Sequence, residues 1–66
     1  MTMKITETHR ISLARAEDYQ YTEVETIKFM MSRYNLCEDD SRDLIANIKE
    51  QRQQVRNMIA QFFNPN

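Results

Sequence analysis

The sequence predicts an all-α protein, an antiparallel helical hairpin that pairs with a second copy to form a four-helix bundle. The chain of 66 residues has no glycine and one proline, a composition that suits helices and opposes a sheet. Its second half carries apolar residues at a helical period. A chain this short buries only about 60% of the surface that it exposes when unfolded, so association with another chain is expected.

Residues 1–11 are expected to form an N-terminal arm. Apolar and polar residues alternate here, with Met3, Ile5 and Ile11 on one parity, and alternation is typical of a strand. Chain termini also fray unless other contacts hold them. The arm is therefore either flexible or a short strand that pairs with its copy in a dimer.

Residues 12–63 are expected to form the hairpin, and its first helix spans about 13–34. Ser12 can cap a helix that starts at Leu13. A Thr22 to Glu25 capping-box pattern lies inside this range, so the alternative is two helices that meet near Tyr21. One long helix, bent near Gln20, is the preferred expectation, because a usable apolar stripe runs through the whole range.

The turn and the last helix have clearer signals. Asn35 tolerates the left-handed conformation that ends a helix, so the turn is expected at 35–39. Asp40 is expected to cap a helix over 40–63, with Asp43 in its first turn. Pro65 pushes the residue before it out of helical geometry, which leaves 64–66 as a tail. At about 1.5 Å per residue, this helix spans roughly 36 Å.

The last helix carries the strongest pattern in the chain. Leu44, Ile48, Val55, Met58 and Phe62 follow at steps of 4, 7, 3 and 4, and only Gln51 places a polar residue in the stripe. Two helices cannot cover all the apolar surface of such a hairpin. The residues expected at a dimer or partner interface share these apolar faces: Ile27, Met30, Met31, Tyr34, Leu44, Ile45, Ile48, Val55, Met58, Ile59 and Phe62.

The charges indicate one candidate contact surface. The formal net charge of −1 selects no class of partner. In a hairpin, cations gather at the end opposite the turn, where they could contact a phosphate backbone or an acidic protein. These candidate contact residues are Lys4, Arg10, Arg15, Arg52 and Arg56.

No motif for catalysis or metal binding is present. One histidine and one cysteine cannot supply a four-ligand zinc site, and without glycine no phosphate-binding loop is possible. His9 and Cys37 fall at opposite ends of the hairpin, and Glu23 and Glu25 lack the Glu-x-x-His partner of a di-metal bundle. We therefore expect no enzyme, no metal, no cofactor and no small-molecule substrate. Cys37 is expected to be an ordinary turn residue or an exposed redox-responsive thiol.

Membrane and secretion signals are absent from the sequence pattern. No run of 18 apolar residues exists, and the first residues form no apolar signal segment. With a single cysteine, these features favour a cytoplasmic protein that does not contact a membrane.

Two resemblances bear on function. In length and two-helix layout the expected hairpin resembles the small plasmid RNA-binding hairpin dimers of the repressor-of-primer type, although no sequence motif matches them. A paired N-terminal strand with Lys4, Thr6, Thr8 and Arg10 outward would resemble a ribbon-helix-helix repressor. The glycine usual in the inter-helix turn of that family is missing, and the last helix is about twice the length that the family has.

Three functions follow as hypotheses. The first is a small non-enzymatic regulatory or adaptor protein, a homodimer that binds a larger protein through its adaptable, methionine-containing apolar surface. The second is a dimeric nucleic-acid-binding regulator. The third is a structural subunit of a larger assembly.

Overall fold

The computed structural model describes the backbone of residues 4–63 and the side chains of residues 4–62. Within this range the chain forms three helices and no strand. They are α1 (Glu7–Asp18), α2 (Glu23–Tyr34) and α3 (Glu38–Phe63). The expected all-α class is confirmed. The expected single helix over about 13–34 is wrong, because this part of the chain contains the end of one helix and the whole of another.

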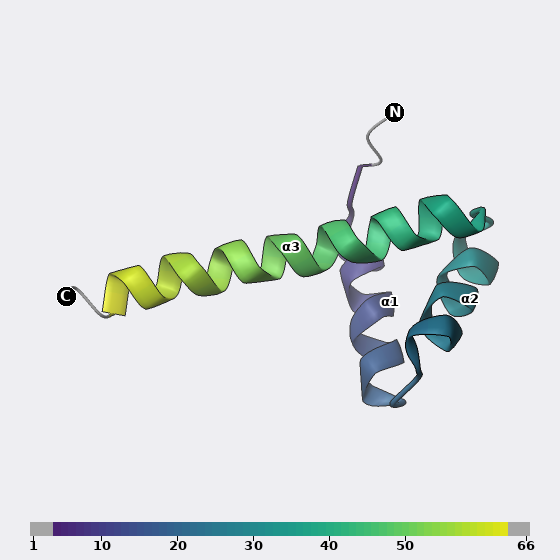
Figure 1. Cartoon of the computed structure of the whole chain (residues 1–66), viewed down its shortest axis with the longest axis horizontal. Helices are drawn as coiled ribbons and strands as arrows, with labels where there is room; N and C mark the ends of the chain where they lie inside the picture. Colours follow the sequence, from purple (N-terminus) through teal and green to yellow (C-terminus); the bar gives the residue numbers. More distant parts are fainter. Residues whose placement is uncertain (1–3, 64–66) are drawn as a thin grey trace.

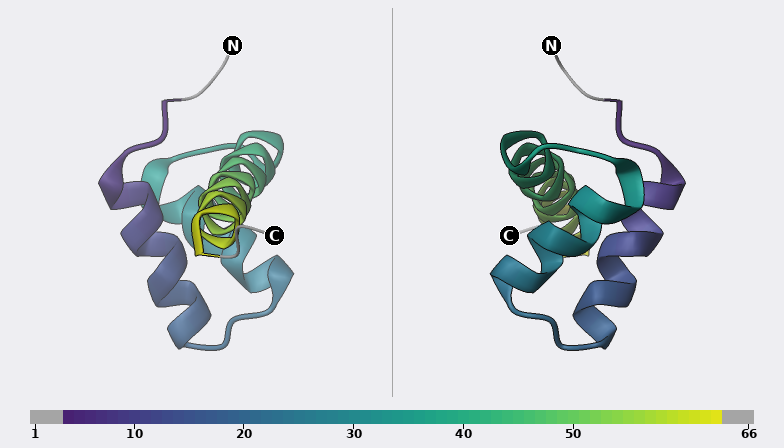
Figure 2. Two further views of the ribbon diagram at one scale, coloured as in Figure 1. Left: turned by 90° about the vertical axis from the view of Figure 1, so that its left-hand side faces the viewer. Right: turned by 90° about the vertical axis from the view of Figure 1, so that its right-hand side faces the viewer.

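The three helices form a compact unit from which half of α3 projects. α1 and α2 lie side by side below one half of α3, and the other half extends away from them (Figure 1). The end-on views show α1 and α2 as the two arms of a V beside α3 (Figure 2). The radius of gyration is 13.6 Å, whereas a compact chain of this length would have about 11 Å. The projecting half of α3 explains the difference.

The start of α1 makes residues 7–11 of the expected N-terminal arm (1–11) helical, so the flexible or strand conformation expected for them is wrong. Thr6 caps the helix: its backbone N–H donates to His9 Nδ1 at 3.1 Å, and its Oγ1 accepts from the His9 N–H at 3.3 Å. This is a capping box with histidine where Glu or Gln is usual. The alternating Thr and Ile residues favour a strand, but capping and packing outweigh strand propensity here. Met3 and the residues before it lie outside the described range.

The break between α1 and α2 is built from two local signals. Gln20 takes the left-handed conformation with φ of 59°, and the Tyr21 N–H returns to the Ala16 carbonyl at 3.1 Å, which closes a Schellman motif. Thr22 then caps α2 in a capping box with Glu25. The alternative with two helices meeting near Tyr21 is thus the observed one.

The connection to α3 follows the expected turn but begins the helix earlier. Asn35 is left-handed with φ of 54°, as expected, and the Leu36 N–H donates to the Met31 carbonyl at 3.0 Å. The expected cap at Asp40 is wrong. Cys37 occupies the cap position, because its carbonyl accepts from Ser41 N–H at 3.0 Å and its Sγ accepts from Asp40 N–H at 3.5 Å. Ser12, the other expected cap, lies inside α1 and is buried.

The core lies where α1 and α2 meet the first half of α3. Its buried apolar residues are Leu13, Ile27, Met30, Leu44, Ile45 and Ile48. Polar groups inside it are paired: Ser41 Oγ donates to the Ile27 carbonyl at 2.9 Å, which joins α3 to α2. Tyr34 Oη donates to the Thr8 carbonyl at 3.0 Å and lies 2.5 Å from Ser12 Oγ, which joins α2 to α1. The apolar residues in the first half of α3 are therefore buried within a single chain.

Candidate protein interface

The apolar stripe of α3 is divided into a buried half and an exposed half. Leu44 and Ile48 are fully buried, as expected from the sequence. Along the same face, Val55 is 55% exposed, and the larger Met58 and Phe62 are 70% and 80% exposed. Val55, expected at a dimer or partner interface, is not covered within one chain, because α1 and α2 both pack against the first half of α3 (Figure 1).

The expected interface residues therefore separate into three groups. Those in the core of the chain are Ile27, Met30, Leu44, Ile45 and Ile48. Met31 and Tyr34 are partly buried against that core. Those exposed on the projecting half of α3 are Val55, Met58, Ile59 and Phe62. From here on, we call residues 51–63 of α3 the tail. We call this last group of four apolar residues the tail face.

Contacts from α1 mark where the tail face begins. Arg10 Nη2 donates to Gln51 Oε1 at 3.0 Å, and Arg52 Nη1 donates to both carboxylate oxygens of Glu17 at 2.8 and 2.9 Å. Residues seven apart on α1 thus converge on adjacent residues of α3, so the two helices cross steeply (Figure 2). Sequence reasoning missed this boundary, because nothing in the spacing of Glu17 relates it to Arg52.

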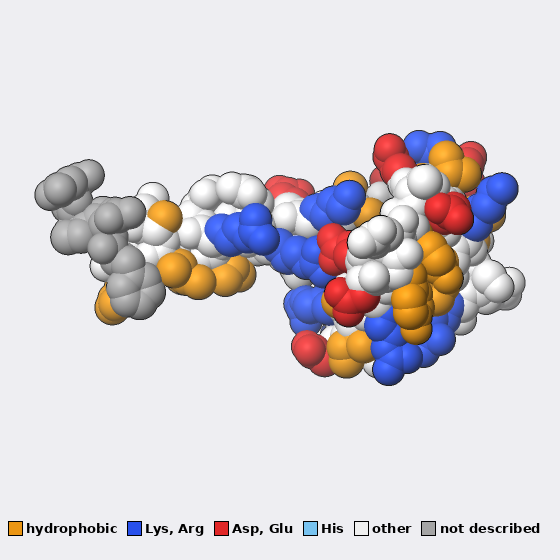
Figure 3. All heavy atoms as spheres, turned by 90° about the horizontal axis from the view of Figure 1, so that it is seen from below, with side chains coloured by type: hydrophobic (Ala, Val, Ile, Leu, Met, Phe, Trp, Pro, Cys, Tyr) orange, Lys and Arg blue, Asp and Glu red, His pale blue; other side chains and the backbone are white. Residues whose placement is uncertain are grey.

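The expected basic residues are only partly brought together. Arg10 and Arg52 both lie at the crossing, but each is engaged with an acidic or amide side chain. Lys4, Arg15 and Arg56 are exposed. On α3, Lys49, Arg52 and Arg56 follow at steps of 3 and 4 and therefore share one face. Figure 3 shows Lys and Arg side chains along this part of α3, with hydrophobic side chains along the edge of its projecting half.

The charge of the tail differs from that of the remaining chain. Residues 51–63 hold Arg52 and Arg56 and no Asp or Glu, so they carry +2. Because the whole chain carries −1, the other residues sum to −3. The tail face is thus an apolar stripe on a cationic helix that projects from an acidic body.

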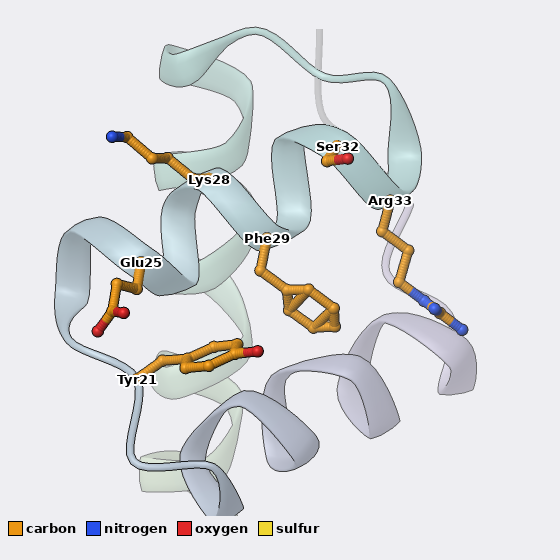
Figure 4. A pocket seen from close by; sticks show the side chains of 6 residues that line it. All are labelled: Tyr21, Glu25, Lys28, Phe29, Ser32 and Arg33. Carbon is orange, nitrogen blue, oxygen red and sulfur yellow. The ribbon is translucent and has the colours of Figure 1, made fainter.

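A second surface lies on the far side of α2. Tyr21, Phe29, Lys28, Arg33, Glu25 and Ser32 line an open hollow (Figure 4). Its floor is formed by edge-to-face rings of Tyr21 and Phe29, with centroids 5.9 Å apart. Tyr19 extends this row, 5.6 Å from Tyr21. These rings hold the α1–α2 connection against α2.

The groups considered for chemistry occupy structural positions. His9 serves in the α1 cap and packs edge-to-face on Tyr34, and Cys37 is exposed at the start of α3. The backbone N–H and then the side chain of Thr22 lower the pKa of Glu25 below its ordinary value. Among residues 4–63, no group of three His, Cys, Asp or Glu side chains could hold a metal ion. No helix in that range is long and apolar enough to span a bilayer.

Comparison with protein-family models, with curated proteins and with solved structures finds no match to this chain.

Proposed function

We propose that this protein is a small non-enzymatic helical adaptor that acts through protein–protein contact, with the tail face as its docking surface. The body formed by α1, α2 and the first half of α3 supports the tail, and the tail presents the contact residues. The exposed, free cysteine suits a reducing compartment such as the cytoplasm.

One observation carries this proposal. The same helical face that forms the core at Leu44 and Ile48 continues without a change of register into the exposed Val55 and Met58. A solvated helix end has no need of large apolar residues at this spacing. Exposed apolar patches of this kind mark interaction sites, and helices dock in grooves through such anchors.

Affinity capture with three forms of the purified protein tests the proposal. The wild type is compared with Met58→Asp, which places a charge in the tail face, and with Ala60→Asp, which places the same charge on the opposite face of α3. Circular dichroism verifies that both variants keep their helices. The proposal expects polypeptides from extracts of the source cells, or further copies of the chain, that the wild type and Ala60→Asp retain and Met58→Asp loses. If no retained polypeptide depends on Met58, the tail face is not a docking surface.

A second candidate function is nucleic-acid binding, and the row of Lys49, Arg52 and Arg56 favours it. It is the weaker candidate because Arg52 is engaged by Glu17 at 2.8 Å and the body is acidic. The double variant Lys49→Glu with Arg56→Glu leaves the Arg52 contact in place. Loss of RNA or DNA binding in this variant, with a strong salt dependence in the wild type, would support the candidate. Binding that the double variant leaves unchanged would remove it.

A further inference from the structure

We infer that the tail face is covered by the tail of a second copy of this chain, with the two tails antiparallel. This inference rests on the proposed docking role of the tail face and names its occupant. It differs from the four-helix bundle expected from the sequence, because only the projecting halves of the two α3 helices form the contact.

The spacing of the tail face suits a pair of helices. Val55 and Phe62 are separated by seven residues, and Met58 lies between them, which is the a and d pattern of a coiled coil. The positions that flank this seam on one side are Gln54 and Gln61. Amide side chains can exchange hydrogen bonds across a seam in either direction, so they introduce no like-charge repulsion when the sequence meets itself.

The place where α1 crosses α3 excludes a parallel pair. α1 lies against α3 at Gln51 and Arg52, on the same side as the tail face. The first half of a parallel partner helix would therefore run into α1. An antiparallel partner presents the last turn of its α3 there, and its own body lies beyond the last turn of the first α3. The relation is a two-fold axis, so each tail ends beside the α1 helix of the other chain.

The distribution of charge separates the two arrangements. Each tail carries +2 and each body −3. The two tails lie side by side in either arrangement, but parallel pairing would also bring the two acidic bodies together, whereas antiparallel pairing places them at opposite ends of the pair.

The available area agrees with a pair of copies. The exposed fractions of Val55, Met58, Ile59 and Phe62 amount to 55%, 70%, 50% and 80%. Together they present on the order of 500 Å² per chain, so two facing tails bury at most about 1,000 Å², the lower limit for a specific interface. Ile11, 48% exposed on α1, can add to this area where the partner tail ends.

The register follows from pairing a positions with d positions. In an antiparallel seam, Val55 of one chain lies against Met58 of the other, and the Phe62 end reaches the level of Gln51. This pairing uses the whole projecting length and stops where α1 begins to cover the helix.

Light scattering over a dilution series tests whether a second copy of the chain covers the tail face. The wild type is expected at about twice its chain mass of 8.0 kDa, and Ala60→Asp is expected to behave in the same way. Met58→Asp should raise the dissociation constant at least a hundredfold, because each dimer would bury two unpaired carboxylates. A wild type that stays monomeric at every concentration, or a Met58→Asp dimer as tight as the wild type, would overturn the inference.

Disulfide trapping tests whether the two tails are antiparallel or parallel. In a Cys37→Ser background, Val55→Cys and Met58→Cys are oxidised separately and as an equimolar mixture. Antiparallel tails predict that the mixture forms cross-linked dimers several-fold faster than either variant alone. Faster linkage of Val55→Cys with itself would mean parallel tails and would overturn the inference.

The two proposals fail in different ways. A monomeric wild type that captures another protein through Met58 contradicts the self-pairing and leaves the docking function in place. If Met58→Asp affects neither dimer mass nor capture, both proposals are wrong.

Discussion

Arg52 on α3 forms an ion pair with Glu17 on α1, and its Nη1 donates hydrogen bonds to the two carboxylate oxygens at 2.8 and 2.9 Å. This ion pair lies at the boundary between the two halves of α3. Before it, α3 is covered by α1 and α2, and after it α3 projects away from them. The pair fixes where α1 crosses α3 and therefore where the tail face begins.

A double-mutant cycle on Glu17 and Arg52 should give a coupling free energy of about 0.5–1 kcal/mol. Both side chains are partly exposed, at 47% and 35%, so solvent screens the pair and a larger value is not expected. Urea unfolding of Glu17→Gln, Arg52→Gln and the double variant measures it, and the coupling should shrink in high salt. The Glu38–Arg42 pair within α3 is the matched control. Zero coupling at low salt would mean that the pair does not hold α1 on α3.

Tyr34→Phe should lower the free energy of unfolding by about 2 kcal/mol. The phenol hydrogen goes to the Thr8 carbonyl, so the buried Ser12 hydroxyl donates to Tyr34 Oη, and the variant removes both bonds. Adding Ser12→Ala should cost less in this background than in the wild type, because the hydroxyl has already lost its partner. Thermal unfolding measures both effects. Tyr19→Phe, at a position 63% exposed, is the control and should be near neutral. Equal losses in Tyr34→Phe and Tyr19→Phe would contradict the network.

Protonation of Glu25 should make α2 less stable in acid. The pKa of Glu25 is lowered from 4.5, first by the hydrogen bond from the Thr22 backbone N–H and then by the Thr22 side chain. A group with a lowered folded pKa stabilises the fold fully above its unfolded value and loses this contribution as the pH falls through the folded value. The difference in unfolding free energy between wild type and Glu25→Gln should therefore be constant near neutral pH and shrink below 4.5. Urea unfolding across this range measures it. The Glu23→Gln variant is the control, and a difference that does not vary with pH would contradict the assignment.

The two halves of the α3 stripe should respond differently to truncation. Leu44→Ala opens a cavity in the core and should lower the free energy of unfolding by about 2–5 kcal/mol. Val55→Ala, at a position 55% exposed, should change it by less than about 0.5 kcal/mol when the protein is dilute enough to be monomeric. Val55→Asp should keep its helices under the same conditions. Comparable losses in Leu44→Ala and Val55→Ala would show that the projecting half is packed within one chain.

Much of the local structure could be predicted from the sequence. The helical class, the left-handed Asn35 and the burial of Leu44 and Ile48 follow from composition, turn chemistry and periodicity. The sequence also shows the capping box at Thr22, but the continuous apolar stripe favours a single helix across it. The sequence does not indicate the start of α1, because histidine replaces the usual Glu or Gln at the third position of its capping box.

The sequence by itself determined that the chain is helical and that α3 carries one continuous apolar face. Only the tertiary structure decided how that face is divided. Periodicity reports which side of a helix is apolar, but the burial of each residue depends on where the neighbouring helices lie against it. Because α1 crosses α3 at Gln51 and Arg52 and the core lies on the first half of α3, the last apolar residues of α3 lie beyond both neighbouring helices and stay exposed.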